Sequence, residues 1–225
     1  MTNQWKKIPV VACCTILAAW VVGIRSEEAP ESAIGEDNDP ITLVSSIPPF
    51  SAGGSSVPHN GSLWRSQNNV IRLTFDAPLP FAPQPGQILI QAMHFCPTPP
   101  PPLPPFGPDL SAGFTFEVED GNVLRIGENG SVLVHRKWYS IRNVGDWSGV
   151  ANFEAQFPVQ VGDASGDSRV LQADAALIQS NVPCLSACGD QNRFDINGDG
   201  RVLQSDVGEA LSRVSSVPSA RPCGW

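Results

Sequence analysis

The 225-residue chain is poor in the residues that most often carry catalysis or nucleic-acid binding. It has three histidines, none at ligand spacing from another histidine or a cysteine, and it lacks the nucleophile-elbow, phosphate-loop and HExxH motifs. Basic residues are also scarce, because 14 Lys and Arg stand against 22 Asp and Glu, for a formal net charge of −8. Such a chain lacks the attraction to phosphate that nucleic acids require. The sequence therefore predicts a non-catalytic protein that does not bind nucleic acid.

Aromatic and charged residues are sparse, at 8% and 16%, whereas Pro (22) and Gly (20) are abundant. This composition favours a loop-rich β protein over a helical one. Short alternating or apolar segments with turn residues between them predict a β-sandwich over residues 41–161, and Asn129-Gly130 predicts a hairpin. The predicted strands are 41–46, 69–76, 88–93, 114–118, 123–126, 132–134, 138–141 and 153–161. The proline-rich segment 97–108 is expected to be a rigid surface insertion, with a ligand for an aromatic-lined groove as the alternative.

The first 25 residues have the pattern of an export signal. Lys6 and Lys7 precede an apolar run from Ile8 to Ile24, which predicts a secreted or cell-surface protein. An uncleaved membrane anchor is the alternative. Residues 26–40 are acidic and polar, so they are predicted to be a disordered linker.

Four cysteines follow the signal, and an oxidising compartment permits them to form disulfides. Four cysteines allow three pairings, and the sequence does not choose among them. They are Cys96, Cys184, Cys188 and Cys223.

Two stretches near the C-terminus, residues 163–174 and 195–206, repeat one pattern. Each places oxygen-bearing side chains at positions 1, 3, 5 and 12, which is the ligand pattern of an EF-hand calcium loop. Position 7 of such a loop contributes its backbone carbonyl. The predicted ligands of two Ca²⁺ ions are Asp163, Ser165, Asp167, Arg169 and Asp174 in the first loop, and Asp195, Asn197, Asp199, Arg201 and Asp206 in the second.

The two loops are not equal copies. The second has Asn197 at position 3 and Gly200 at position 6, where the first has Ser165 and Ser168. A sharp turn at position 6 favours a residue without Cβ. Judged on these residues alone, the second loop is expected to bind calcium more tightly.

The repeated stretches resemble a type I dockerin module, in which two calcium loops are each followed by an apolar helix. The matching stretches begin at Gly162-Asp163 and Phe194-Asp195, and the resemblance covers residues 162–225. It implies calcium-dependent folding and binding to a cohesin-like protein domain. At position 9 the chain departs from the family with Leu171 and Leu203, so water replaces a ligand there or the ligand is missing. Positions 10 and 11 of the family often face the partner, which makes the candidate partner-binding residues Gln172, Ala173, Gln204 and Ser205.

A second resemblance concerns the predicted sandwich. Residues 44–49 (VSSIPP) and 70–79 (VIRLTFDAPL) are similar to the opening of bacterial Ig-like domains. That resemblance implies a sandwich used as a spacer or adhesion module, without a catalytic set.

Together these patterns predict a mostly β chain. An Ig-like β-sandwich (41–161) precedes a small α-helical dockerin-like calcium-binding module (162–225), with helices at 173–181 and 205–214, and the two modules are expected to melt separately. The predicted function is calcium-dependent assembly with a cohesin-like partner. One alternative is a cell-surface structural protein in which calcium is only a staple. The other is a carbohydrate-binding module of polysaccharide degradation, for which the candidate aromatics are Trp64, Trp138 and Trp147.

Overall fold

The structure is a computed structural model that describes residues 39–49, 51–52, 61–93, 106–185 and 192–216. The chain divides into two compact units, residues 1–37 and residues 38–225, and every described residue belongs to the second unit. The predicted export signal lies outside the described residues, and so does all but the end of the predicted linker. None of the helices in the described ranges has the length and apolar character needed to cross a membrane.

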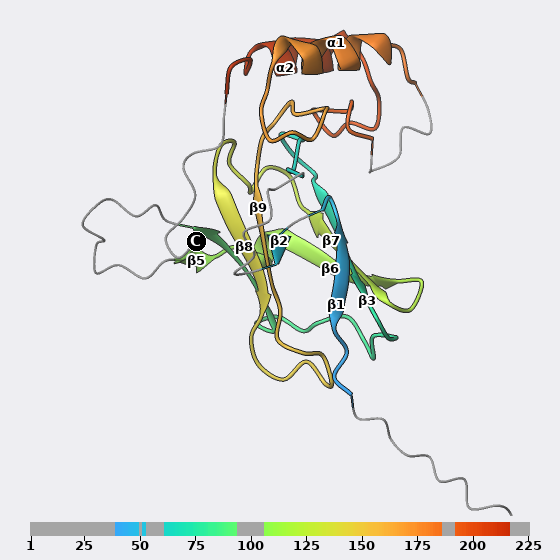
Figure 1. Cartoon of the computed structure of the whole chain (residues 1–225), viewed down its shortest axis with the longest axis vertical. Helices are drawn as coiled ribbons and strands as arrows, with labels where there is room; N and C mark the ends of the chain where they lie inside the picture. The colour runs from blue at the N-terminus through green and yellow to red at the C-terminus, as the bar shows by residue number, and fades with distance from the viewer. Residues whose placement is uncertain (1–38, 50, 53–60, 94–105, 186–191, 217–225) are drawn as a thin grey trace, which may run out of the picture. The chain divides into compact units, whose positions relative to one another are not determined.

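The described strands form two antiparallel sheets (Figure 1), which confirms the mostly β class. The first sheet has the order β1 (Leu43–Ile47), β3 (Val70–Phe75), β7 (Val123–Glu128) and β6 (Phe114–Glu119). The second has the order β2 (Ser51–Ala52), β9 (Glu154–Pro158), β8 (Trp138–Asn143), β4 (Ile88–Met93) and β5 (Phe106–Asp109). Three neighbouring pairs, β6–β7, β4–β5 and β8–β9, are consecutive in sequence, whereas β1–β3, β3–β7, β4–β8 and β2–β9 join strands that are further apart in the chain.

The two sheets share one apolar core, which follows from the alternation seen in the sequence. In β3, Ile71, Leu73 and Phe75 are buried, while Arg72 and Thr74 between them are only half-buried. Phe75 meets Trp147 edge to face, with ring centroids 5.7 Å apart. All three tryptophans proposed as saccharide contacts, Trp64, Trp138 and Trp147, are at most 4% exposed. They are core residues, and they present no aromatic platform to solvent.

Two local predictions are wrong. Residues 132–134 are not a strand, and Asn129-Gly130 is not a hairpin turn. The buried carboxylate of Glu128 explains this, because its Oε1 accepts the backbone N–H groups of Val132 and Leu133 at 2.7 and 2.8 Å. Those groups are then not available to a strand ladder.

A further correction concerns the proline-rich insertion, which was expected to run to Pro108. Residues 106–109 instead form β5, with Pro108 inside it. This strand is at the edge of its sheet, where a residue without an N–H is tolerated. The proline-rich residues 97–105 lie outside the described ranges.

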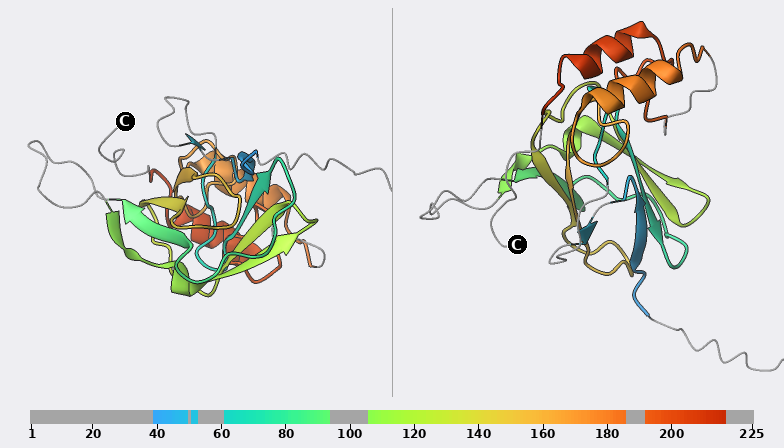
Figure 2. Two further views of the ribbon diagram at one scale, coloured as in Figure 1. Left: turned by 90° about the horizontal axis from the view of Figure 1, so that it is seen from below. Right: turned by 45° about the horizontal axis from the view of Figure 1, so that its top comes forward.

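Two helices follow the sheets, α1 (Gln172–Ser180) and α2 (Gln204–Leu211), close to the predicted bounds. They lie side by side in both views of Figure 2. Their buried residues Ile178, Val207 and Ala210 belong to the same apolar cluster as the sheet residues. We refer to residues 39–161 as the sheet region and to residues 162–216 as the loop–helix region. The predicted module boundary at 161/162 lies inside the second unit.

Glu128 provides a test of this core. It is 5% exposed and accepts bonds from Asn69 as well as from Val132 and Leu133. Glu128→Ala leaves several buried N–H groups without an acceptor, so we expect a loss of about 3 kcal/mol of unfolding free energy in urea titrations. Glu117→Ala is the control, because that side chain is 61% exposed beside Arg125, and its loss should stay within about 0.5 kcal/mol. Equal losses would contradict the assigned role.

Candidate calcium-binding loops

The two predicted loops have the same local structure. Equivalent residues are 32 positions apart, as in Asp163 and Asp195 (195 − 163 = 32). Asp163 Oδ1 accepts the backbone N–H groups of positions 4 and 5, and its Oδ2 accepts that of position 6, at 2.7–3.1 Å. Asp195 does the same in the second loop, at 2.9–3.2 Å. Each loop therefore wraps around the carboxylate at its first position.

The carboxylate at position 12 closes each loop and begins the helix. Asp174 Oδ1 accepts the N–H of Ser165 at position 3, and its Oδ2 accepts the N–H of Leu171, the residue before α1, at 2.8 Å. Asp206 makes the same bond to Leu203, and its Oδ1 accepts the N–H groups of positions 2 and 3. An acidic side chain in the first helical turn also suits the positive end of the helix dipole. Loop and helix are thus fixed by one residue.

All four of these carboxylates are at most 1% exposed. Burial raises the pKa of Asp163, and the nearby Asp174 raises it further, whereas the bonds from Ser62 and the loop N–H groups lower it. Burial likewise raises the pKa of Asp195, with Asp206 adding to the effect and Arg65 opposing it. In each loop, the buried carboxylates at positions 1 and 12 repel each other when both are ionised. A divalent cation between them removes this cost.

The donors at the predicted ligand positions are carboxylate, amide, hydroxyl and carbonyl oxygens, which are the ligands of a hard cation rather than of one that prefers thiol and imidazole. Within the described residues, no three His, Cys, Asp or Glu side chains gather as a metal-holding group. Calcium takes six to eight oxygens and accepts carbonyl, amide, hydroxyl and water ligands. The side chains at position 5, Asp167 and Asp199, are exposed and accept the N–H groups of Arg169 and Arg201. Arg169 and Arg201 are exposed as well.

Position 6 requires the left-handed backbone conformation in both loops. Gly200 has φ of +83° and Ser168 has φ of +66°. A residue with Cβ is strained in this region by about 1 kcal/mol. At position 6, the first loop therefore carries a backbone strain that the second loop avoids with glycine.

The two repeats are interlocked by short β-bridges. Val170, at position 8 of the first loop, pairs with Ser216, which follows α2. Val202, at position 8 of the second loop, pairs with Cys184, which follows α1. Cys184 is also disulfide-bonded, and all other cysteines lie outside the described residues. Each loop is thus held by the segment that follows the other repeat's helix.

The sequence did not reveal that residues 61–69, here named the linking segment, contact both loops. Ser62 Oγ donates to Asp163 Oδ2 at 2.5 Å, and the Arg65 guanidinium lies 3.1 Å from Asp195 Oδ2. Between them, Trp64 Nε1 donates to the carbonyl of Asn192 at 3.2 Å. The segment precedes β3 and its sequence predicts a polar loop, because nothing in its composition distinguishes a buried loop from an exposed one. Only the burial of this segment marks it as a contact of the loops, and burial is known only from the folded structure.

A close approach of backbone also ties the linking segment to the second loop. A Cβ on Gly198, at position 4, would lie 2.6 Å from the Gln67 carbonyl oxygen. The Ser66 N–H donates to the carbonyl of Ile196 at 2.8 Å. Only glycine permits this contact, so the loop sequence is adapted to the sheet region.

The candidate partner-binding residues lie at the first positions of the two helices. All four of them are exposed, and none takes part in the buried network of the loops. The same helical segments have large exposed apolar side chains, including Leu171 directly before α1 and Leu211 at the end of α2. The four residues are Gln172, Ala173, Gln204 and Ser205.

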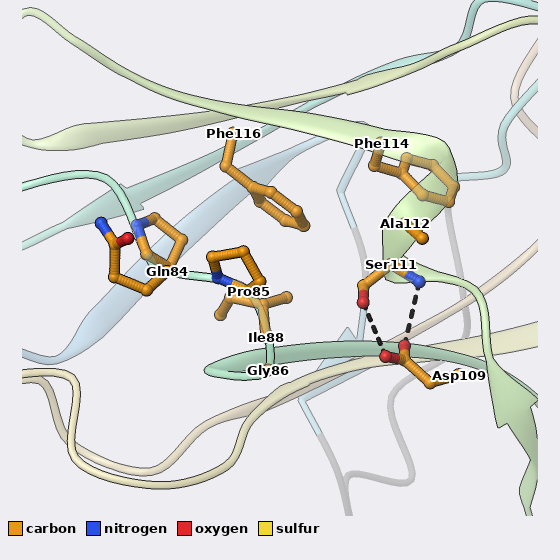
Figure 3. Close-up of a pocket in the computed structure, with 10 residues that line it drawn as sticks. Gln84, Pro85, Gly86, Ile88, Asp109, Ser111, Ala112, Phe114 and Phe116 are labelled. Atoms are coloured by element: carbon orange, nitrogen blue, oxygen red, sulfur yellow. Dashed lines mark hydrogen bonds between the residues drawn. The ribbon is translucent and has the colours of Figure 1, made fainter.

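A separate cavity of about 540 Å³ lies beside β6 and η1 (Ser111–Gly113) (Figure 3). Phe114, Phe116 and Ile88 line its apolar wall. Its one acidic group, Asp109, accepts hydrogen bonds from the backbone N–H and the hydroxyl of Ser111, at 2.9 and 2.6 Å. The cavity shares no residue with the two loops, and its carboxylate is already engaged.

Comparison of the chain with protein-family models, with curated proteins and with solved structures gives no match. The functional argument therefore depends on the loops themselves.

His135 should make the stability depend on pH. It accepts the N–H of Val161 at Nδ1 (3.0 Å), and burial, with the charges of Arg213 and Arg136, lowers its pKa from 6.5 to about 4. The unfolded chain then binds a proton before the folded chain does, so stability is lost as the pH falls from about 6.5 towards 4. After a discount for solvent screening, the effect is on the order of 1 kcal/mol.

Urea unfolding at pH 7.5 and pH 5 should therefore show a larger loss for the wild type than for His135→Gln, whose amide oxygen can still accept the Val161 N–H. The same pH dependence in both proteins would refute this assignment.

Proposed function

We propose that residues 163–174 and 195–206 bind two calcium ions and that this binding supports assembly with a partner protein. The observation that carries the proposal is the pair of buried carboxylates at positions 1 and 12 of each loop. Their mutual repulsion contributes to the raised pKa of the first carboxylate. Calcium would be held by these groups, by the side chains at positions 3 and 5, and by the position-7 carbonyls of Arg169 and Arg201. The ion would supply positive charge to the buried carboxylates of the first loop, which form no ion pair with a Lys or Arg among the described residues.

The assembly part of the proposal rests on the exposed helix starts. The starts of α1 and α2 carry exposed polar residues, and exposed leucines lie beside the start of α1, within α1 and at the end of α2, a mixture that suits a protein interface. Because Asp174 and Asp206 each belong to both a loop and a helix, the ions would fix the positions of these surfaces. The resemblance to dockerin modules makes a cohesin-like domain the first partner to test.

A second candidate function is a structural staple, in which calcium only holds the chain together. The bonds from Ser62 and Arg65 to the first loop positions favour it, because they join the loops to the sheet region. A staple would bind calcium without any calcium-dependent partner.

Calcium titration of the full chain by calorimetry should give two sites, with dissociation constants of about 10⁻⁶ to 10⁻³ M. Asp174→Asn and Asp206→Asn should each bind one calcium ion fewer than the wild type. At a calcium concentration one-hundredfold above the dissociation constant, one bound ion adds about 2.7 kcal/mol to the free energy of unfolding, and each variant should lack this contribution. Asp76→Asn is the control, because Asp76 is exposed and bonded to Thr42 in the sheet region, and it should keep both ions. A wild-type titration without binding would refute the proposal.

Partner binding is tested by surface plasmon resonance against a panel of cohesin-type domains. We expect binding in calcium and none in EDTA, and we expect Ala173→Arg with Ser205→Arg to weaken it at least one-hundredfold because both side chains are exposed at the proposed interface. The same pair of arginines at Ser45 and Ser131, which are exposed in the sheet region, is the matched control. Two calcium ions without any such binding would leave the staple as the function.

A further inference from the structure

The buried cation beside the second loop is Arg65, in the linking segment. Its side chain is 5% exposed, and its guanidinium nitrogen lies 3.1 Å from Asp195 Oδ2. Its Nε also donates to the backbone carbonyl of Asp195, at 3.1 Å. Arg65 thus holds the first residue of the loop at two points, one of which is a charge pair.

The first loop has a neutral group in the equivalent place. Ser62 donates its hydroxyl to Asp163 Oδ2, and neither Asp163 nor Asp174 pairs with an arginine or lysine among the described residues. Arg193 lies over the Trp64 ring, 5.1 Å from its centroid, and its guanidinium packs on Gly166 of the first loop, where an added Cβ would lie 1.8 Å from Nη1. Among the described residues it forms no ion pair with a carboxylate of that loop. Each loop contains three Asp side chains at its ligand positions. Among the described residues, only the second loop has one of its three negative charges in a direct ion pair with a cation.

We propose that Arg65 is an internal counter-ion of the second loop, which stabilises its calcium-free form and lowers its calcium affinity below that of the first loop. The inference rests on the calcium binding proposed above. It reverses the order expected from Asn197 and Gly200, because the loop residues alone do not show the arginine. Calcium would then fill the first loop before the second.

The direction of the effect follows from electrostatics. A fixed positive charge beside a ligand repels the incoming ion, and at the effective dielectric constant of about 20 that suits protein sites, a charge this close changes affinity at least tenfold. Without calcium, the same charge offsets the burial of Asp195, which would otherwise be an unpaired buried anion. A residue that only positioned Asp195 would have the opposite effect, because its removal would weaken calcium binding.

The test is a calcium titration of the full chain followed by NMR, with the amide signals of Ser168 and Gly200 as reporters of the first and second loops. Both N–H groups donate to the position-1 carboxylate of their own loop. In the wild type, Ser168 should respond at lower calcium than Gly200. In Arg65→Gln, the midpoint for Gly200 should fall at least tenfold, while that for Ser168 stays within twofold. The melting temperature of this variant in EDTA should also fall.

Three further variants separate charge from structure. Arg65→Lys keeps the charge and should leave the Gly200 midpoint within threefold of the wild type. Ser62→Ala removes the neutral bond to the first loop and should not move the Ser168 midpoint to lower calcium. Arg72→Gln makes the same change of net charge at the Arg72–Glu119 pair in the sheet region, and it should leave both midpoints unchanged. If Arg65→Gln is unfolded in EDTA, the comparison is made from the calcium-loaded state. A chelator is added, and the variant should release calcium more slowly than the wild type.

The outcomes are distinct. If neither amide responds to calcium in the wild type, the proposed calcium binding fails and the role of Arg65 fails with it. If both respond and Arg65→Gln leaves the Gly200 midpoint unchanged or raises it, only the counter-ion role is overturned. If Arg65→Lys lowers that midpoint as much as Arg65→Gln does, charge is not the cause, and the inference is again wrong.

Discussion

The loop–helix region depends on the burial of four aspartates. Each position-1 carboxylate accepts three backbone N–H groups, and each position-12 carboxylate joins a loop to a helix. These bonds satisfy the acceptors, yet they do not cancel two negative charges buried together. A cation beside the carboxylates would remove the remaining cost, and the surroundings of the two loops differ in this respect. The first has only neutral donors among the described residues, whereas the second already has Arg65.

The strands and helices were largely predictable from the sequence, because each depends on a local pattern. The alternation in β3 places apolar side chains on one face of the strand, and the repeated Val before each helix is buried in both loops. The false strand at 132–134 shows where local reasoning fails. Its apolar residues fit a strand, but the carboxylate of Glu128 takes their N–H groups. A contact of this kind depends on how β7 ends, and no strand propensity describes it.

The sequence identified the two loops and the carboxylates at their centres, but it did not show what surrounds them. The spacing of Asp, Ser and Asn identified the loops, and the structure places positions 1 and 12 of each loop together, as the pattern requires. The linking segment reads as a polar loop, because Ser62 and Arg65 are about one hundred residues or more away from their partners in sequence. Only the three-dimensional path of the chain brings them there. The resemblance to small calcium modules gave no reason to expect such a contact, because it covers residues 162–225 alone.

The bridges between the repeats have a consequence for symmetry. Val170 pairs with Ser216, and Val202 pairs with Cys184. The two bridges are equivalent, because Val202 lies 32 residues after Val170 and Cys184 lies 32 residues before Ser216 (170 + 32 = 202, 216 − 32 = 184). This is the reciprocal contact of an isologous dimer, written within one chain. A single repeat has half of each bridge and an open edge in place of the other half. Two separate copies of one repeat could close both edges around a twofold axis, but that association would depend on concentration. Joining the repeats in one chain makes the association permanent at a fixed ratio of one to one.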